Sequence, residues 1–136
     1  MSVRKGDRSE TKLEVLNIIR QLAAYSMGIC KNEKIIPKSS RWIMSQRIVN
    51  ECLDAYSCVR RANAVYVTNK LEYNYRHEQQ VEAHAHIDAL LGLIDIAYGM
   101  YSIESRKIEY WTGLAIQADD ALKKWTKSDT ERYLNG

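Results

Sequence analysis

A single proline, Pro37, interrupts the 136 residues of this chain, and it lies in the first third of the sequence. Proline disfavours the α conformation of the residue before it, so a helix must end near Ile36. The six glycines are scattered and form no cluster of the kind that connects short strands. The sequence therefore favours long helices on either side of one marked break.

Apolar residues recur at steps of three and four residues in four separate stretches, which is the spacing of one face of an α-helix. The four sets, which we call seams, are Val15, Ile18, Leu22, Tyr25 and Ile29; Ile48, Cys52, Ala55, Val59, Ala62 and Tyr66; His84, Ile87, Leu91, Ile94, Tyr98 and Tyr101; and Ile108, Trp111, Ala115, Ala118, Leu122 and Trp125. Leu16 and Ile19 widen the first seam, and Leu90 and Ala97 lie beside the third. We predict helices over about 11–32, 40–67, 71–101 and 104–127, with flexible tails at 1–9 and 128–136. Because short connections make neighbouring helices antiparallel, the expected fold is an all-α, up-down-up-down four-helix bundle.

Polar residues at all four predicted starts have the pattern of helix caps. Two pairs have capping-box spacing, serines follow Pro37, and a further serine separates the third and fourth helices; these residues are Thr11 with Glu14, Asn69 with Glu72, Ser39 or Ser40, and Ser102. We expect each of them to cap the helix that it precedes.

Composition excludes several protein classes. No apolar run approaches the roughly 20 residues that a membrane-spanning helix needs, and the polar N-terminus lacks the apolar core of a secretory signal. The three cysteines, Cys30, Cys52 and Cys58, form no C-x-x-C motif. One of them must stay unpaired in a monomer, and a reducing cytoplasmic location is the simplest expectation. All twelve aromatic residues are Tyr or Trp, whose polar groups suit half-buried and interface positions.

The sequence does not predict an enzyme or a bound cofactor. A di-iron bundle needs a Glu-x-x-His pair on each of two helices, and no such pair is present. Glu82 and His86, one helical turn apart, could share a metal ion, but a hydrogen-bonded surface pair is the favoured interpretation. A metal-dependent enzyme built around these two residues remains a distant alternative, which metal analysis would test. His84 falls on the apolar seam, where a paired core or interface histidine is expected.

The net charge of +3 is distributed unevenly along the chain. Residues 1–47 hold ten basic and four acidic residues, whereas residues 48–136 hold ten basic and thirteen acidic residues. Arg41 and the pair Arg106–Lys107 lie near predicted helix N-termini, where the dipole disfavours cations and an anionic partner would offset the cost. The pair Arg60–Arg61 is selected on charge alone. Such cations would contact phosphates weakly in one bundle and more strongly in an oligomer.

Several apolar residues lie beside or outside the four seams: Leu13, Leu16, Ile43, Met44, Leu53, Tyr56, Leu93 and Met100. A bundle helix needs only about three positions in seven turned inward. This surplus indicates either a wide core or a subunit interface, and we favour the interface.

Specific segments resemble the "four helix bundle protein" group. The resemblance covers about residues 12–127 and is strongest at Ile36-Pro-Lys-Ser-Ser-Arg-Trp42, Gln46-Arg-Ile48 and Tyr110-Trp111. Ala62, the run 90–97, Ile103, Arg106-Lys107 and Lys124-Trp125 also fit. The group includes the accessory variability proteins (Avd) of diversity-generating retroelements and bundles encoded in intervening sequences of ribosomal RNA genes. The tryptophans and the Lys-Lys-Trp segment favour the retroelement branch.

The resemblance implies a homopentameric barrel of bundles without an active site, which binds the element's reverse transcriptase and its template RNA or cDNA during mutagenic copying. Carried over by motif, the residues expected to contact phosphate or polymerase are Lys38, Arg41, Arg47, Arg106 and Lys107. The acidic residues Glu78, Glu82, Asp88 and Asp95 keep the net charge modest, which favours protein docking over direct RNA binding. The alternative is a self-assembling structural bundle of the ribosomal intervening-sequence type, without a polymerase partner.

Overall fold

The computed structural model describes residues 5–134, with side chains from residue 11 onward. Within this range the chain forms four long helices and no strand, which confirms the all-helical prediction. The helices are α1 (Lys5–Lys31), α2 (Gln46–Ala64), α3 (Lys70–Met100) and α4 (Ser105–Tyr133). A 3₁₀ turn (Lys38–Ser40) and a π-helical turn (Arg41–Ser45) precede α2.

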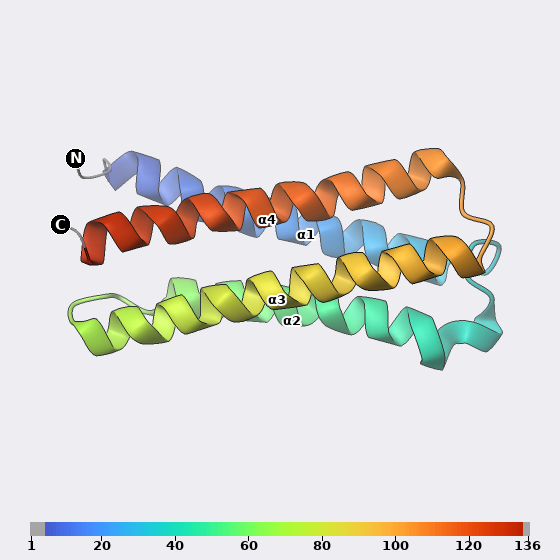
Figure 1. The fold of residues 1–136 in the computed structure, drawn as a ribbon, viewed down its shortest axis with the longest axis horizontal. Coiled ribbons are helices and arrows are strands. Elements are labelled where there is room, and N and C mark those ends of the chain that lie inside the picture. The colour runs from blue at the N-terminus through green and yellow to red at the C-terminus, as the bar shows by residue number, and fades with distance from the viewer. Residues whose placement is uncertain (1–4, 135–136) are drawn as a thin grey trace.

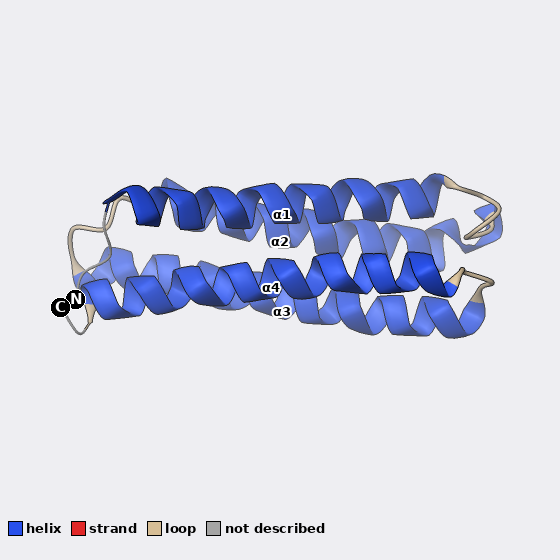
Figure 2. Ribbon diagram, turned by 90° about the horizontal axis from the view of Figure 1, so that it is seen from above, coloured by secondary structure: helices blue, strands red, loops and turns tan. Residues whose placement is uncertain are grey.

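The four helices lie along one long axis (Figures 1 and 2). Helix α1 packs against α2 and α4, and α3 packs against the same two helices. The α1–α2 and α3–α4 connections lie at one end of the molecule, which we call the two-loop end, and the α2–α3 connection lies at the opposite end (Figure 1). No helix in the described part of the chain is both long and apolar enough to cross a membrane.

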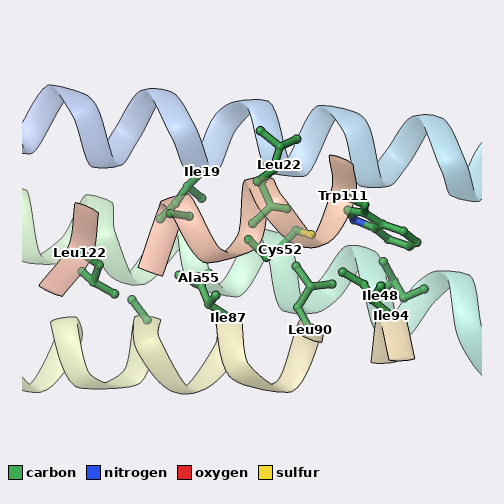
Figure 3. Close-up of a cluster of buried hydrophobic side chains, with 14 of the residues drawn as sticks. Ile19, Leu22, Ile48, Cys52, Ala55, Ile87, Leu90, Ile94, Trp111 and Leu122 are labelled. Carbon is green, nitrogen blue, oxygen red and sulfur yellow. The ribbon is translucent and has the colours of Figure 1, made fainter. Parts of the chain in front are cut away.

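The core follows the predicted helical period along all four helices. Figure 3 shows side chains from each helix converging on the bundle interior, including Ile19, Ile48, Leu90 and Trp111. The Trp111 indole Nε1 donates a hydrogen bond to Ser26 Oγ at 2.8 Å, and Ser26 Oγ donates in turn to the Leu22 carbonyl. This polar pair is fully satisfied, so a tryptophan can occupy the core without an orphaned donor.

The predicted seams were wrong at some positions because part of the buried stripe lies about one residue away. On α3 the predicted Ile87 and Ile94 are buried, as are Leu90 and Ala97 beside them, whereas the predicted His84 and Tyr98 are exposed. Tyr66, predicted to lie on the second seam, is 84% exposed because α2 ends at Ala64. A small error in phase moves a side chain from the core to the surface without changing the period.

The surplus apolar residues divide between core and surface. Leu16 and Met44 are buried and Tyr56 and Leu93 are half-buried, so part of the surplus widens the core. The exposed remainder consists of Leu13, Ile43, Leu53 and Met100.

Three predicted helix caps were wrong, and one is confirmed. Helix α1 begins six residues before Thr11, so Thr11 lies inside the helix rather than at its cap. Neither Ser39 nor Ser40 caps α2, which begins at Gln46 without a side-chain cap. Ser102 does not cap α4 either, since the N-cap residue of α4 is Glu104 and its side chain makes no capping hydrogen bond. At α3, the Glu72 backbone N–H donates to Asn69 Oδ1 at 2.9 Å, as predicted.

Helix α4 continues through residues 128–133, where a flexible tail was predicted. A buried ion pair explains the difference: Arg76 Nη1 of α3 donates to Asp129 Oδ1 of α4 at 3.2 Å. Arg76 also donates to the Ala62 and Val65 carbonyls where α2 ends, and Gln80 donates to Asp129 Oδ2. This network joins three helices at the end opposite the two loops. The predicted tail at 1–9 overlaps α1 from Lys5 onward, and residues 1–4 and 135–136 lie outside the described residues.

Candidate functional site

The segment 32–45 builds the two-loop end through a tightly bonded turn. The Asn32 carbonyl accepts backbone hydrogen bonds from Ile35 and Ile36 at 2.9 and 3.0 Å. The Asn32 side chain accepts a further bond from the Lys34 N–H. Ile36 is buried against the core, so the turn is fixed by an apolar anchor as well as by its hydrogen bonds.

The π-helical turn Arg41–Ser45 determines which side chains this end presents. Extra residues in a helical turn shift the face on which the following side chains lie. Met44 and Ser45 face inward, whereas Trp42 and Ile43 are 73% and 63% exposed. Arg41 lies beside them and is also exposed.

Five of the seven predicted site residues lie at the two-loop end. Lys38 and Arg41 belong to the α1–α2 connection, Arg47 is the second residue of α2, and Arg106 and Lys107 are the second and third residues of α4. Lys107 is half-buried and the other four are exposed. Among the described residues, none of the five has a carboxylate oxygen within 4 Å. Their charges are therefore not neutralised by a direct ion pair in that part of the chain.

Tyr25 of α1 fixes the start of α4 at this end. Its hydroxyl donates to the Lys107 carbonyl at 3.5 Å, and its ring meets the Tyr110 ring edge-on at a centroid distance of 4.8 Å. Burial, followed by the nearby Tyr110 and Glu104, raises the pKa of Tyr25, so its hydroxyl keeps its proton. Arg106 and Lys107 are thus held by packing rather than on a loose loop.

Arg60 and Arg61 lie on the last turns of α2, toward the opposite end of the bundle. Arg61 Nη1 lies 4.0 Å from Cys58 Sγ. The structure does not bring these two residues together with the other five.

Trp42 is the residue that sequence reasoning missed. It was noted only as part of a motif, yet it is the exposed tryptophan, while Trp111 and Trp125 are buried. The signal in the sequence was a large aromatic between Arg41 and Arg47. Aromatic faces between cations are typical of surfaces that bind single-stranded nucleic acid.

Glu82 and His86 do not form the predicted hydrogen-bonded pair, because each has another partner. His86 Nδ1 hydrogen-bonds to Glu51 Oε2 of α2 at 2.7 Å, whereas the Glu82 carboxylate accepts from the Cys58 thiol at 3.9 Å. His84 is paired with Asp119, but its side chain is 48% exposed and not in the core. No cluster of three or more potential metal ligands occurs in the part of the chain that the structure describes.

The cysteines at 30, 52 and 58 are all free thiols. Cys52 and Cys58 are buried and Cys30 is half-buried.

Comparisons of this chain with protein-family models, with curated proteins and with solved structures found no match.

Proposed function

We propose that this protein is a non-catalytic accessory subunit that binds a reverse transcriptase and its template RNA or cDNA through the two-loop end of the bundle. The observation that carries the proposal is that the segments bearing Lys38, Arg41, Arg47, Arg106 and Lys107 lie at the same end of the bundle as the exposed Trp42. These residues come from segments far apart in the sequence. The retroelement partner comes from the family resemblance of the segment 36–48.

The chemistry of this end suits a single-stranded nucleic acid. Each cation that contacts a phosphate releases a counterion, which adds salt-dependent affinity without sequence preference. A base stacked on an exposed tryptophan contributes about 1–3 kcal/mol. Carboxylates at Glu78, Glu82, Asp88 and Asp95 line exposed positions of α3, and they would repel a polyanion from that side of the molecule.

Self-assembly is part of the proposal. Connections at alternating ends support an antiparallel up-down-up-down protomer (Figure 1), and the exposed Leu13 and Leu53 support a further contact between protomers. The resemblance implies five copies. A ring would place several two-loop ends together and raise the affinity through multivalency.

The test is co-purification with a cognate reverse transcriptase and its template RNA. The variant Arg41→Glu with Arg47→Glu reverses two charges at the two-loop end, and we expect it to abolish co-purification while light scattering gives an unchanged assembly. Native binding by this variant would overturn the surface assignment.

Arg60→Glu with Arg61→Glu is the matched control, because it makes the same change in charge at exposed positions near the opposite end of α2. We expect it to bind the polymerase and RNA as the wild type does. Equal loss in both variants would show that net charge, rather than the two-loop end, governs binding. A stable monomer in light scattering would remove the multivalency part of the proposal.

A further inference from the structure

A groove of about 540 Å³ lies beside the π-helical turn, between the last turns of α1, the connection and the first turn of α2. Its apolar lining comes from Met27, Cys30, Ile36 and Val49. Three cations, Lys31, Lys38 and Arg41, also line it, together with the single carboxylate of Glu33. The groove is therefore apolar inside and carries an excess of positive charge.

The groove is formed before any partner arrives. The bonds from Asn32 to Ile35 and Ile36 fix one wall, and the Cys30 thiol donates to the Ser45 carbonyl at 3.8 Å across the groove's two helical segments. Little conformational freedom remains to be lost on binding, which favours affinity for a short ligand.

The lining indicates what kind of ligand fits. Its volume falls within the range of ligand-binding clefts, about 300–1,000 Å³, and is large enough for more than one apolar side chain. The groove residues include no aromatic side chain on which a base could stack, whereas nucleic acid has no aliphatic groups that need such a cavity. None of the three lining cations has a carboxylate within 4 Å among the described residues, so they are available to an acidic ligand.

We propose that this groove docks an acidic peptide segment of a protein partner, with large apolar side chains in the groove and carboxylates paired to Lys31, Lys38 and Arg41. The inference rests on the proposed function in requiring a protein partner at the two-loop end. The peptide and the nucleic acid then use different residues of the two-loop end. The peptide occupies the groove, whereas Trp42, Arg47 and Arg106 remain accessible to nucleic acid.

The first test selects binders from a library of short random peptides displayed on phage, with the full-length protein as bait. We expect enriched sequences to combine Asp or Glu with Leu, Ile or aromatic residues. The best peptide, synthesised with a fluorophore, should bind Lys31→Glu with Arg41→Glu about tenfold or more weakly than wild type, because two attractive contacts become repulsive. Lys124→Glu with Lys127→Glu, on exposed positions near the opposite end, is the matched control and should bind as wild type. Circular dichroism establishes that each variant is folded.

A second test uses the wild-type protein alone. Cys30 lines the groove, whereas Cys52 and Cys58 are only 1% and 2% exposed, so alkylation of Cys30 by iodoacetamide reports occupancy. The peptide should slow this reaction, and oligouridylate should not.

Four results would overturn the proposal: no enrichment above background, enrichment of basic or purely polar peptides, peptide binding that leaves Cys30 unprotected, or equal protection by oligouridylate. Failure of peptide binding with intact RNA binding would remove the groove assignment alone. Peptide binding with no RNA binding would instead remove the nucleic-acid part of the proposed function.

Discussion

Trp42 is the residue on which the nucleic-acid proposal can be examined most simply. Trp111 and Trp125 are 0% and 2% exposed, so Trp42 is the tryptophan that solvent and ligand reach. We predict that oligouridylate quenches the tryptophan fluorescence of the wild type and that Trp42→Ala abolishes this quenching. The variant should also bind about 1–3 kcal/mol more weakly, the value of one stacked base. Quenching that persists in Trp42→Ala would place the RNA elsewhere.

Arg76 is a buried charged residue whose contacts join α2, α3 and α4. Its side chain is 3% exposed, and its guanidinium pairs with Asp129, donates to two carbonyls, and lies 5.8 Å from the Trp125 ring centroid. Arg76→Met leaves the Asp129 carboxylate buried and unpaired, so we predict a loss of about 3–5 kcal/mol in the free energy of unfolding. Urea denaturation measures this loss.

The matched control for that variant is Arg76→Met with Asp129→Leu, which removes both charges. We expect it to be clearly more stable than Arg76→Met alone, since no isolated charge remains buried. If both variants lost the same free energy, the packing of Arg76, and not its charge pair, would be the source of stability.

Cys52 gives a prediction with a defined pH dependence. Burial raises the pKa of its thiol from 9.0 to about 11. The unfolded chain therefore loses this proton at lower pH than the folded protein does, and stability falls as pH rises from 9 to 11. The associated change is on the order of 2 kcal/mol, and it should disappear in Cys52→Ala when urea unfolding is compared below pH 9 and near pH 11. An unchanged pH slope in that variant would contradict the assignment to Cys52.

At the scale of the helices, the start of α3 shows what capping contributes. Asn69 accepts from the Glu72 N–H, and the Glu72 carboxylate accepts from the Thr68 N–H and hydroxyl. We predict that Asn69→Ala lowers the free energy of unfolding by about 1 kcal/mol, whereas Asn74→Ala, an exposed site inside α3, should cost much less. Denaturation curves of the two variants make the comparison.

The same cap adds a pH dependence of opposite sign to that of Cys52. The hydrogen bonds from Thr68 lower the pKa of the Glu72 carboxyl below 4.5. This contribution is present above pH 4.5 and is lost as pH falls through the lowered value. The thermal midpoints of wild type and Glu72→Gln should therefore converge in acid, and a difference that stays constant with pH would contradict the assignment.

The helices also show which features of the fold could be predicted from the sequence. Periodicity identified four helices because the core residues Ile48, Ala55, Ile87 and Trp111 keep a helical spacing. The Asn69 cap was predictable because all of its partners are local. The end of α4 was not, since the Arg76–Asp129 pair joins residues far apart in the sequence.

The sequence identified most residues of the candidate site, but it predicted only part of their arrangement in space. The motif 36–48 and the pair Arg106–Lys107 were identified, but their meeting at one end depends on the order in which the helices turn back. The π-helical turn that exposes Trp42 lies between the buried Ile36 and the core of α2 and includes the buried Met44. No local pattern in the sequence predicts this turn.

For the whole molecule, the central claim is that one end of the bundle is the nucleic-acid interface. The most direct measurement is the salt dependence of oligouridylate affinity for three forms: wild type, Arg47→Gln with Arg106→Gln, and Arg60→Gln with Arg61→Gln. Each phosphate contact to a single strand adds about 0.7 to the slope of log affinity against log salt concentration. We predict that the first variant loses about 1.4 from the wild-type slope and that the second keeps it. Equal slopes in all three forms, or the larger loss in the Arg60 and Arg61 variant, would contradict the account.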